Sequence, residues 1–120
     1  MTSSYLAMLR LRAEELGSDF VVISIPGQSR VDPGARIAGI EPLACEIEEK
    51  LDRVCTELNI RYIDLLPDMR TAREQTQSPL YYFADRHLTP LGNQVVAGVL
   101  ARQLAALLRE KKDADSGAET

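Results

Sequence analysis

The 120-residue chain has no tryptophan, one histidine and only two cysteines, which limits the chemistry it can support. Cys45 and Cys55 fall on one predicted helix, where ten residues rise ~15 Å, too far for a disulfide. One histidine and two such thiols are too few ligands of the right type for a metal centre. The sequence therefore predicts no disulfide, no metal and no cofactor, and both cysteines are interpreted as small core or boundary residues.

Long apolar runs and excess positive charge are also lacking. The longest apolar stretch, residues 20–25 interrupted by Ser24, is far shorter than the ~20 residues that span a bilayer. No signal peptide or membrane segment is predicted, and the chain as written is expected to be cytoplasmic. Fourteen basic against eighteen acidic residues give a net charge of −4, which argues against a nucleic-acid surface.

The apolar spacing in the first half predicts helix, strand and helix. The first helix is expected over residues 4–16, ended by Gly17, with an inner face of Tyr5, Leu9, Ala13 and Leu16. Residues 20–25 form an almost continuously apolar strand, typical of a parallel strand covered on both faces. After a polar loop, Pro42 opens a helix with a stripe of Leu43, Ile47, Leu51, Val54 and Leu58.

The second half begins with another strand. Asn59 is expected to end the preceding helix, residues 60–65 form the strand, and residues 66–76 form a weak helix. A last helix follows Thr89, a good N-cap, and Pro90 in the first helical position. Its apolar face contains Val95, Val96, Val99, Leu100, Leu104, Leu107 and Leu108. Residues 1–109 are predicted to be a single α/β domain, and residues 110–120 a disordered tail.

The sheet implied by these elements is incomplete. Two parallel strands joined by a right-handed crossover are expected, but two strands cannot easily bury a segment as apolar as residues 20–25. An open apolar strand edge invites pairing with another chain.

The only histidine lies in an Asp-x-His motif before the last helix. In an extended segment residues two apart point to the same side, so the Asp85 carboxylate could accept a hydrogen bond from one ring nitrogen of His87. The other ring nitrogen would then be free to take a proton from a nucleophile, as in a hydrolytic triad. A solvated surface pair is the alternative interpretation of this short motif.

Two stretches of the sequence resemble one enzyme family. Residues 79–92 read Pro-Leu-Tyr-Tyr-Phe-Ala-Asp-Arg-His-Leu-Thr-Pro-Leu-Gly and are followed by Val-Val-Ala and a leucine-rich helix. This run resembles the C-terminal catalytic block of SGNH (GDSL-type) hydrolases, closest to the branch that includes alginate O-acetyltransferase-like domains. Residues 25–31 are similar to a segment of that branch in which Pro-x-Lys-x-x-Val is common, with Gln28 in place of the lysine.

The resemblance implies a partial three-layer α/β/α, flavodoxin-like domain with few parallel strands flanked by helices. It also implies an ester hydrolase or O-acyltransferase in which His87 is the general base and Asp85 orients it. The family's Gly-Asp-Ser nucleophile motif is absent from the 120 residues, and neither Ser24 nor Ser29 has flanking residues that would activate it. Relatives in this branch often work outside the cytoplasm.

Two readings of function follow. In the first, the chain is the C-terminal half of an SGNH domain, inactive alone because it lacks the serine, with an acylated small molecule or a carbohydrate as substrate and an N-terminal half as partner. The alternative is a non-catalytic interaction module or degenerate copy that self-associates, as a homo-oligomer, or docks through the open strand edge.

Overall fold

The computed structural model describes residues 2–32 and 40–118. It contains two compact units, Met1–Leu66 and Pro67–Thr120, each of which is described by itself. The described part of the chain is mixed α/β, with two parallel strands flanked by helices. The fold class expected from the sequence is therefore confirmed.

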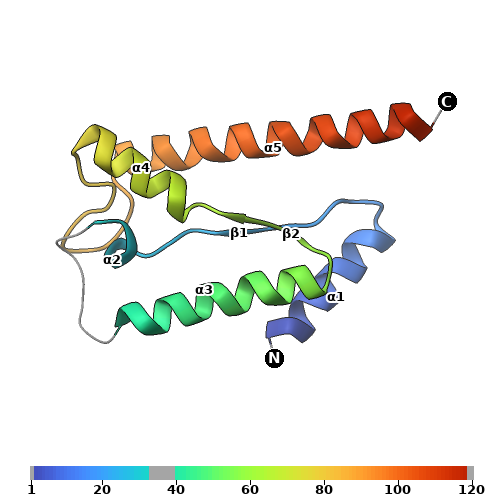
Figure 1. The fold of residues 1–120 in the computed structure, drawn as a ribbon, viewed down its shortest axis with the longest axis horizontal. Helices are drawn as coiled ribbons and strands as arrows, with labels where there is room; N and C mark the ends of the chain where they lie inside the picture. The colour runs from blue at the N-terminus through green and yellow to red at the C-terminus, as the bar shows by residue number, and fades with distance from the viewer. Residues whose placement is uncertain (1, 33–39, 119–120) are drawn as a thin grey trace. The chain divides into compact units, whose positions relative to one another are not determined.

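The first unit holds both strands (Figure 1). Its elements are, in order, α1 (Thr2–Glu15), β1 (Val21–Ser24), α2 (Gln28–Val31), α3 (Ile40–Glu57) and β2 (Arg61–Asp64). The α3 helix begins two residues before Pro42, which was expected to open it. The α2 turn lies inside the segment predicted to be a polar loop, and residues 33–39 of that loop lie outside the described residues.

β1 and β2 pair in parallel, as the sequence predicted. The register runs from Val21 opposite Arg61 to Ser24 opposite Asp64. Helix α3 connects the strands and packs against β2, so a helix covers the sheet as expected for a βαβ crossover. Asn59, which ends α3, has a φ of 55°, the left-handed conformation that commonly terminates a helix.

Helix α1 presents a different face from the one predicted. The large apolar residues of the expected inner face are exposed: Tyr5 and Leu16 by 64% and Leu9 by 54%. Arg10 instead lies on the half-buried side, and its Nη1 donates a hydrogen bond to the Leu58 carbonyl. Leu58 lies one residue beyond the end of α3, where carbonyl groups have no partner within the helix. The half-buried face of α1 thus contains Arg10 and not the predicted apolar stripe.

The first strand is less covered than predicted. Ile23 is 38% exposed and Ile25, just beyond the end of β1, is 52% exposed, so the expectation of a strand covered on both faces is wrong here. Ile63 of β2, in contrast, is only 5% exposed. Ile47 on the predicted inner stripe of α3 is also exposed, by 58%. Among the described residues the sheet has only two strands, so β1 has a neighbouring strand on one side only. This leaves Ile23 and Ile25 partly uncovered.

The described residues of the second unit contain two helices. Helix α4 spans Leu66–Thr76 and α5 spans Pro90–Ala118. α5 continues past Arg109 through residues 110–118, which the sequence predicted to be disordered. Five of these nine residues, Glu110, Lys111, Lys112, Ala114 and Ala118, are of types with high helix propensity. Residues 119–120 lie outside the described residues.

By length and composition alone, residues 90–114 of α5 meet the requirement for a membrane-crossing helix. No membrane segment was predicted from the sequence, because no uninterrupted apolar run is long enough. The side chains of α5 are distributed unevenly: Val96 and Val99 are buried, whereas Gln94, Arg102 and Gln103 are exposed. The buried residues therefore lie near the start of α5, whereas Leu104 and Leu108, which were expected on the same apolar face, are 38% and 67% exposed.

The two cysteines differ in their surroundings and should differ in reactivity. Cys55 is fully buried, and burial, followed by the nearby Asp52 carboxylate, raises the pKa of its thiol. Cys45 is only half-buried. Because the thiolate is the reactive form, we expect native protein at a pH of about 8 to be alkylated by iodoacetamide at Cys45 and not at Cys55. Peptide mass analysis would show this, with urea-unfolded protein as the control. Equal labelling of the two native thiols would contradict the burial of Cys55.

Candidate active site

The Asp-x-His motif lies on a tight loop closed by backbone hydrogen bonds. The Tyr82 N–H donates to the His87 carbonyl at 2.7 Å, and the Arg86 N–H donates to the Tyr82 carbonyl at 2.9 Å. Next to them, Tyr81 and Leu88 form an antiparallel bridge. Arg86 takes the left-handed conformation, with a φ of 63°. Cross-bonds at the base thus fix the shape of the loop from residue 82 to residue 87.

Asp85 and His87 are brought together, as the sequence predicted, but the carboxylate has another principal partner. Asp85 Oδ1 accepts a hydrogen bond from the His87 backbone N–H at 3.0 Å. The same oxygen lies 3.6 Å from His87 Nδ1, within ion-pair range but longer than a hydrogen bond. The side chains of Asp85 and His87 are 61% and 83% exposed. The carboxylate therefore stabilises the turn and lies beside the Nδ1 edge of the imidazole.

Thr89 joins this loop to helix α5. Its backbone N–H donates to the Leu80 carbonyl at 2.9 Å, and its hydroxyl donates to the Pro79 carbonyl at 3.1 Å. The hydroxyl oxygen also accepts from the Gly92 N–H at 3.0 Å, which satisfies one of the unpaired donors at the start of α5. The predicted N-cap is confirmed. Thr89 also binds the segment that precedes the loop, through the carbonyls of Pro79 and Leu80.

Gly92 allows the loop and the helix to approach this closely. A Cβ atom at this position would lie 3.0 Å from the Leu80 carbonyl carbon and from Leu88 Cδ2, and closer still to the Leu80 oxygen. Real Cβ atoms do not approach other atoms so closely, so a side chain at residue 92 would displace the chain at Leu80. Thr89 and Gly92 together therefore fix where the Asp-x-His loop leaves the helix.

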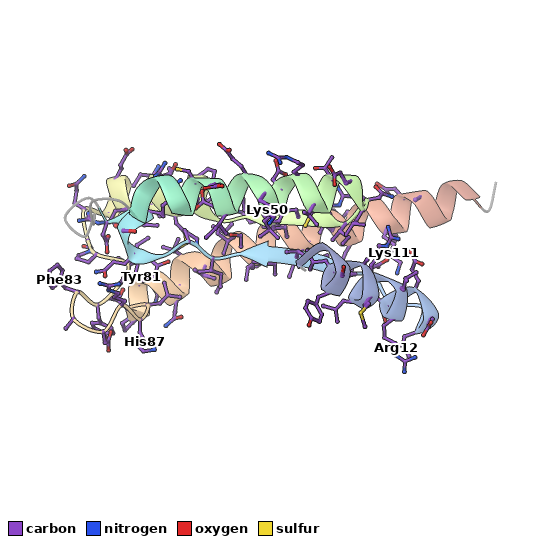
Figure 2. All side chains as sticks on the ribbon, turned by 90° about the horizontal axis from the view of Figure 1, so that it is seen from below. Arg12, Lys50, Tyr81, Phe83, His87 and Lys111 are labelled. Atoms are coloured by element: carbon purple, nitrogen blue, oxygen red, sulfur yellow. The ribbon has the colours of Figure 1, made fainter. Side chains whose placement is uncertain are left out.

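The tip of the loop exposes aromatic side chains that the sequence motif did not single out. Figure 2 shows Phe83 and His87 projecting from the loop, while Tyr81 lies against the chain. Phe83 is 80% exposed and Tyr82 is 49% exposed, whereas Tyr81 is 5% exposed. The only sign of these exposed aromatics in the sequence is the run of three consecutive aromatic residues 81–83, which does not indicate which of them are buried.

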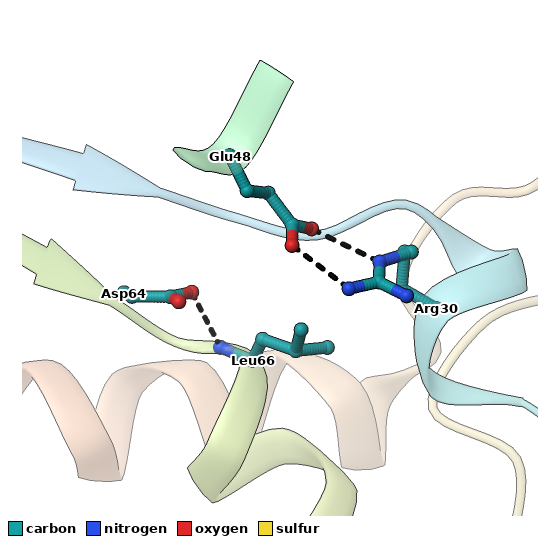
Figure 3. A network of polar contacts seen from close by, with 4 residues as sticks. All are labelled: Arg30, Glu48, Asp64 and Leu66. Carbon is teal, nitrogen blue, oxygen red and sulfur yellow. Dashed lines mark hydrogen bonds and ion pairs between the residues drawn. The ribbon is translucent and has the colours of Figure 1, made fainter. Parts of the chain in front are cut away.

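In the first unit, polar side chains gather where the strands end (Figure 3). Arg30 on α2 forms a bidentate pair with Glu48 on α3, with Nε at 3.1 Å and Nη2 at 2.8 Å from the carboxylate oxygens. Both side chains are largely buried, at 11% and 20% exposed. Asp64 Oδ1 accepts from the Leu66 N–H at 3.0 Å, so this strand-end aspartate caps the start of α4. The Arg30 pair fastens α2 to α3.

Gln28, which replaces the lysine of the Pro-x-Lys-x-x-Val pattern, is buried on α2 at 7% exposed.

Tyr62 lies on β2 with a buried hydroxyl. Burial raises the pKa of this phenol; the Ser24 hydroxyl lowers it, and carboxylates including Asp64 and Glu48 raise it further. Among the residues that the structure describes, no group of three His, Cys, Asp or Glu side chains could hold a metal ion.

One protein-family model matches this chain over residues 2–120: the SGNH hydrolase-like domain of the acetyltransferase AlgX. The chain belongs to this family. No curated protein and no solved structure matches it significantly. The match covers both units, including β1, β2 and the Asp-x-His loop, so the resemblance seen in residues 79–92 and 25–31 is confirmed at the level of the family.

Removal of the Thr89 hydroxyl should loosen the site. In this SGNH-like domain we expect Thr89→Ala to lower the free energy of unfolding by about 1 kcal/mol, because the N-cap is lost. Thr89→Ser keeps the donor and the acceptor and should stay close to the parent protein. Urea unfolding followed by circular dichroism measures both, and an alanine variant as stable as the serine variant would show that the cap contributes nothing.

Proposed function

We propose that this chain contributes the general base of an SGNH-type ester hydrolase or O-acyltransferase. His87 takes the proton from a serine hydroxyl as the serine attacks an ester carbonyl, and Asp85 orients the imidazole. The attack forms an acyl-enzyme and releases the alcohol, which takes the proton back from His87. Transfer of the acyl group to water or to a second alcohol then regenerates the serine.

The observation that carries this proposal is the fixed juxtaposition of Asp85 and His87 on the closed loop. The carboxylate oxygen lies 3.6 Å from Nδ1, so a proton on Nδ1 points toward negative charge. Nε2 is then the unprotonated nitrogen that can accept a proton. Catalytic hydrogen bonds are often long without substrate and shorten when it binds. The high exposure of His87 leaves its ring accessible to a nucleophile and a substrate.

The serine is the part of the machinery that these 120 residues do not supply in a recognisable form. They contain no Gly-Asp-Ser, and neither Ser24 nor Ser29 has flanking residues that would activate its hydroxyl. A base and an orienting carboxylate without nucleophile and oxyanion donors lose most of a triad's rate enhancement. We therefore propose that the chain acts with a serine from elsewhere, on an acylated small molecule or a carbohydrate ester.

The orienting role of Asp85 can be tested without any substrate. In alkaline buffer, where the imidazole is neutral, we expect the Asp85 carboxylate to favour the tautomer with its proton on Nδ1. Long-range ¹H–¹⁵N NMR of the only histidine reads this tautomer directly. Asp85→Asn should shift His87 toward the Nε2–H tautomer, because the negative charge beside Nδ1 is gone. The matched control, Asp113→Asn near the other end of α5, should leave it unchanged. The same tautomer ratio in all three proteins would refute the orienting role.

The chain alone should be a poor esterase. We expect it to hydrolyse 4-nitrophenyl acetate no faster than an equal concentration of free imidazole, because His87 has no catalytic serine from which to accept a proton. The measurement is the release of nitrophenolate by the parent protein and by His87→Ala. Turnover far above free imidazole that disappears in His87→Ala would instead place a working nucleophile within the chain, and Ser24→Ala and Ser29→Ala would locate it.

A further inference from the structure

The two ends of the Asp-x-His loop are joined by a short antiparallel ladder. The Thr89 N–H donates to the Leu80 carbonyl at 2.9 Å, and the Tyr82 N–H donates to the His87 carbonyl at 2.7 Å. These two bonds flank the isolated bridge described above, the arrangement of an antiparallel pair without hydrogen bonds of its own. One end of the ladder therefore lies next to helix α5, and the other end lies next to the turn that contains the imidazole.

Gly92 lies against the helix end of this ladder. Gly92 is buried, and a Cβ atom on it would lie 3.0 Å from the Leu80 carbonyl carbon and closer still to the Leu80 oxygen. That oxygen is the acceptor of the Thr89 N–H. Leu80 is itself fully buried, so its backbone cannot move without disturbing the packed side chains around it. A side chain at residue 92 would therefore disturb the first bond of the ladder.

Helix formation alone would favour another residue at this position. Gly92 lies in the first turn of α5, and only proline is a poorer helix former than glycine. Gly98 of the same helix is exposed, and a Cβ atom there would meet nothing within 4 Å. Of these two glycines, only Gly92 is required by a close approach of the chain. The pair therefore separates helix propensity from contact with the loop.

We propose that Gly92 is a positioning residue for the general base and acts through Leu80 and the ladder on the imidazole of His87. The inference rests on the proposed function of His87. With both bonds of the ladder in place, Tyr82 and His87 are held opposite each other and the turn between them is closed. Asp85 Oδ1 then lies 3.0 Å from the His87 N–H and 3.6 Å from Nδ1.

The backbone of the loop sets the position of the imidazole. The side chains of Asp85 and His87 are largely exposed, so in the described part of the chain packing contributes little to holding them together. A displaced Leu80 carbonyl would leave the bond between Tyr82 and His87 without its neighbour in the ladder. Isolated strand pairs are only marginally stable, so this bond would open more often. The carboxylate would then no longer be held beside Nδ1.

The tautomer of neutral His87 measures this positioning. We expect Gly92→Ala to shift the imidazole from the Nδ1–H toward the Nε2–H tautomer, in the same direction as Asp85→Asn. Gly98→Ala is the matched control, because it adds the same methyl group to the same helix away from the loop, and it should leave the tautomer ratio unchanged. Long-range ¹H–¹⁵N NMR in alkaline buffer gives the ratio for the parent protein and for each variant.

The two alanine variants should also change stability in opposite directions. Gly98→Ala should raise the urea concentration at the midpoint of unfolding, because alanine favours the helix. Gly92→Ala should lower the midpoint in spite of the same gain in propensity, because the added methyl group displaces Leu80. Equal stabilisation by the two substitutions would overturn the inference, since it would show that the chain accepts a side chain at residue 92.

The outcomes separate this inference from the proposed function. If Asp85→Asn shifts the tautomer and Gly92→Ala does not, Gly92 does not position the base, and the orienting role of Asp85 stands. If Asp85→Asn has no effect, the orienting role fails and the inference fails with it. Circular dichroism verifies that each variant is folded.

An unfolded Gly92→Ala would be replaced by Thr89→Ala, which adds no atoms. This substitution removes the hydroxyl bonds to the Pro79 carbonyl and the Gly92 N–H at the same end of the ladder. It should shift the His87 tautomer toward Nε2–H, whereas Thr89→Ser, which keeps both bonds, should not. An unchanged tautomer in Thr89→Ala would overturn the inference.

Discussion

Backbone N–H and C=O groups need hydrogen-bond partners, and this requirement fixes how the elements of this structure join. At the start of α5 the Thr89 hydroxyl pairs with the Gly92 N–H. At the start of α4, Asp64 does the same for Leu66, and near the end of α3 the Leu58 carbonyl is paired by Arg10. Each bond fixes how one element leaves or meets another. The candidate site depends on the first of them, because Thr89 also holds the chain before the loop.

The elements of the fold could be predicted well from the sequence, because their signals are local. Helical spacing, the Asn59 helix end and the Thr89–Pro90 start each depend on a few neighbouring residues, and each is confirmed. The face of α1 could not be predicted in this way. Its stripe of Tyr5, Leu9 and Leu16 indicates burial, yet these residues are exposed and Arg10 on the half-buried side contacts a carbonyl 48 residues away. Contacts between distant segments leave no periodic signal in the sequence.

The proximity of Asp85 and His87 could be predicted from the sequence, but the geometry of their loop could not. Spacing alone suggested that Asp85 and His87 share a side of an extended segment, whereas the structure places them on a tight turn in which the carboxylate first binds the His87 backbone N–H. The left-handed conformation of Arg86 and the exposure of Phe83 belong to that turn. Neither follows from the residue types, because the turn arises from the cross-bonds between its two ends.

The way in which the loop is closed determines where its length could change during evolution. Its base is fixed by the bonds between Tyr82 and His87, the Tyr81–Leu88 bridge and the Thr89 N–H to the Leu80 carbonyl. Residues inserted at the tip, beside Phe83, would enlarge the loop without altering this base. An insertion between Leu88 and Gly92 would instead shift the helix cap and bring a residue with a side chain against the Leu80 carbonyl. Homologous loops of different length should therefore differ at the tip, while the spacing from the histidine to the helix stays constant.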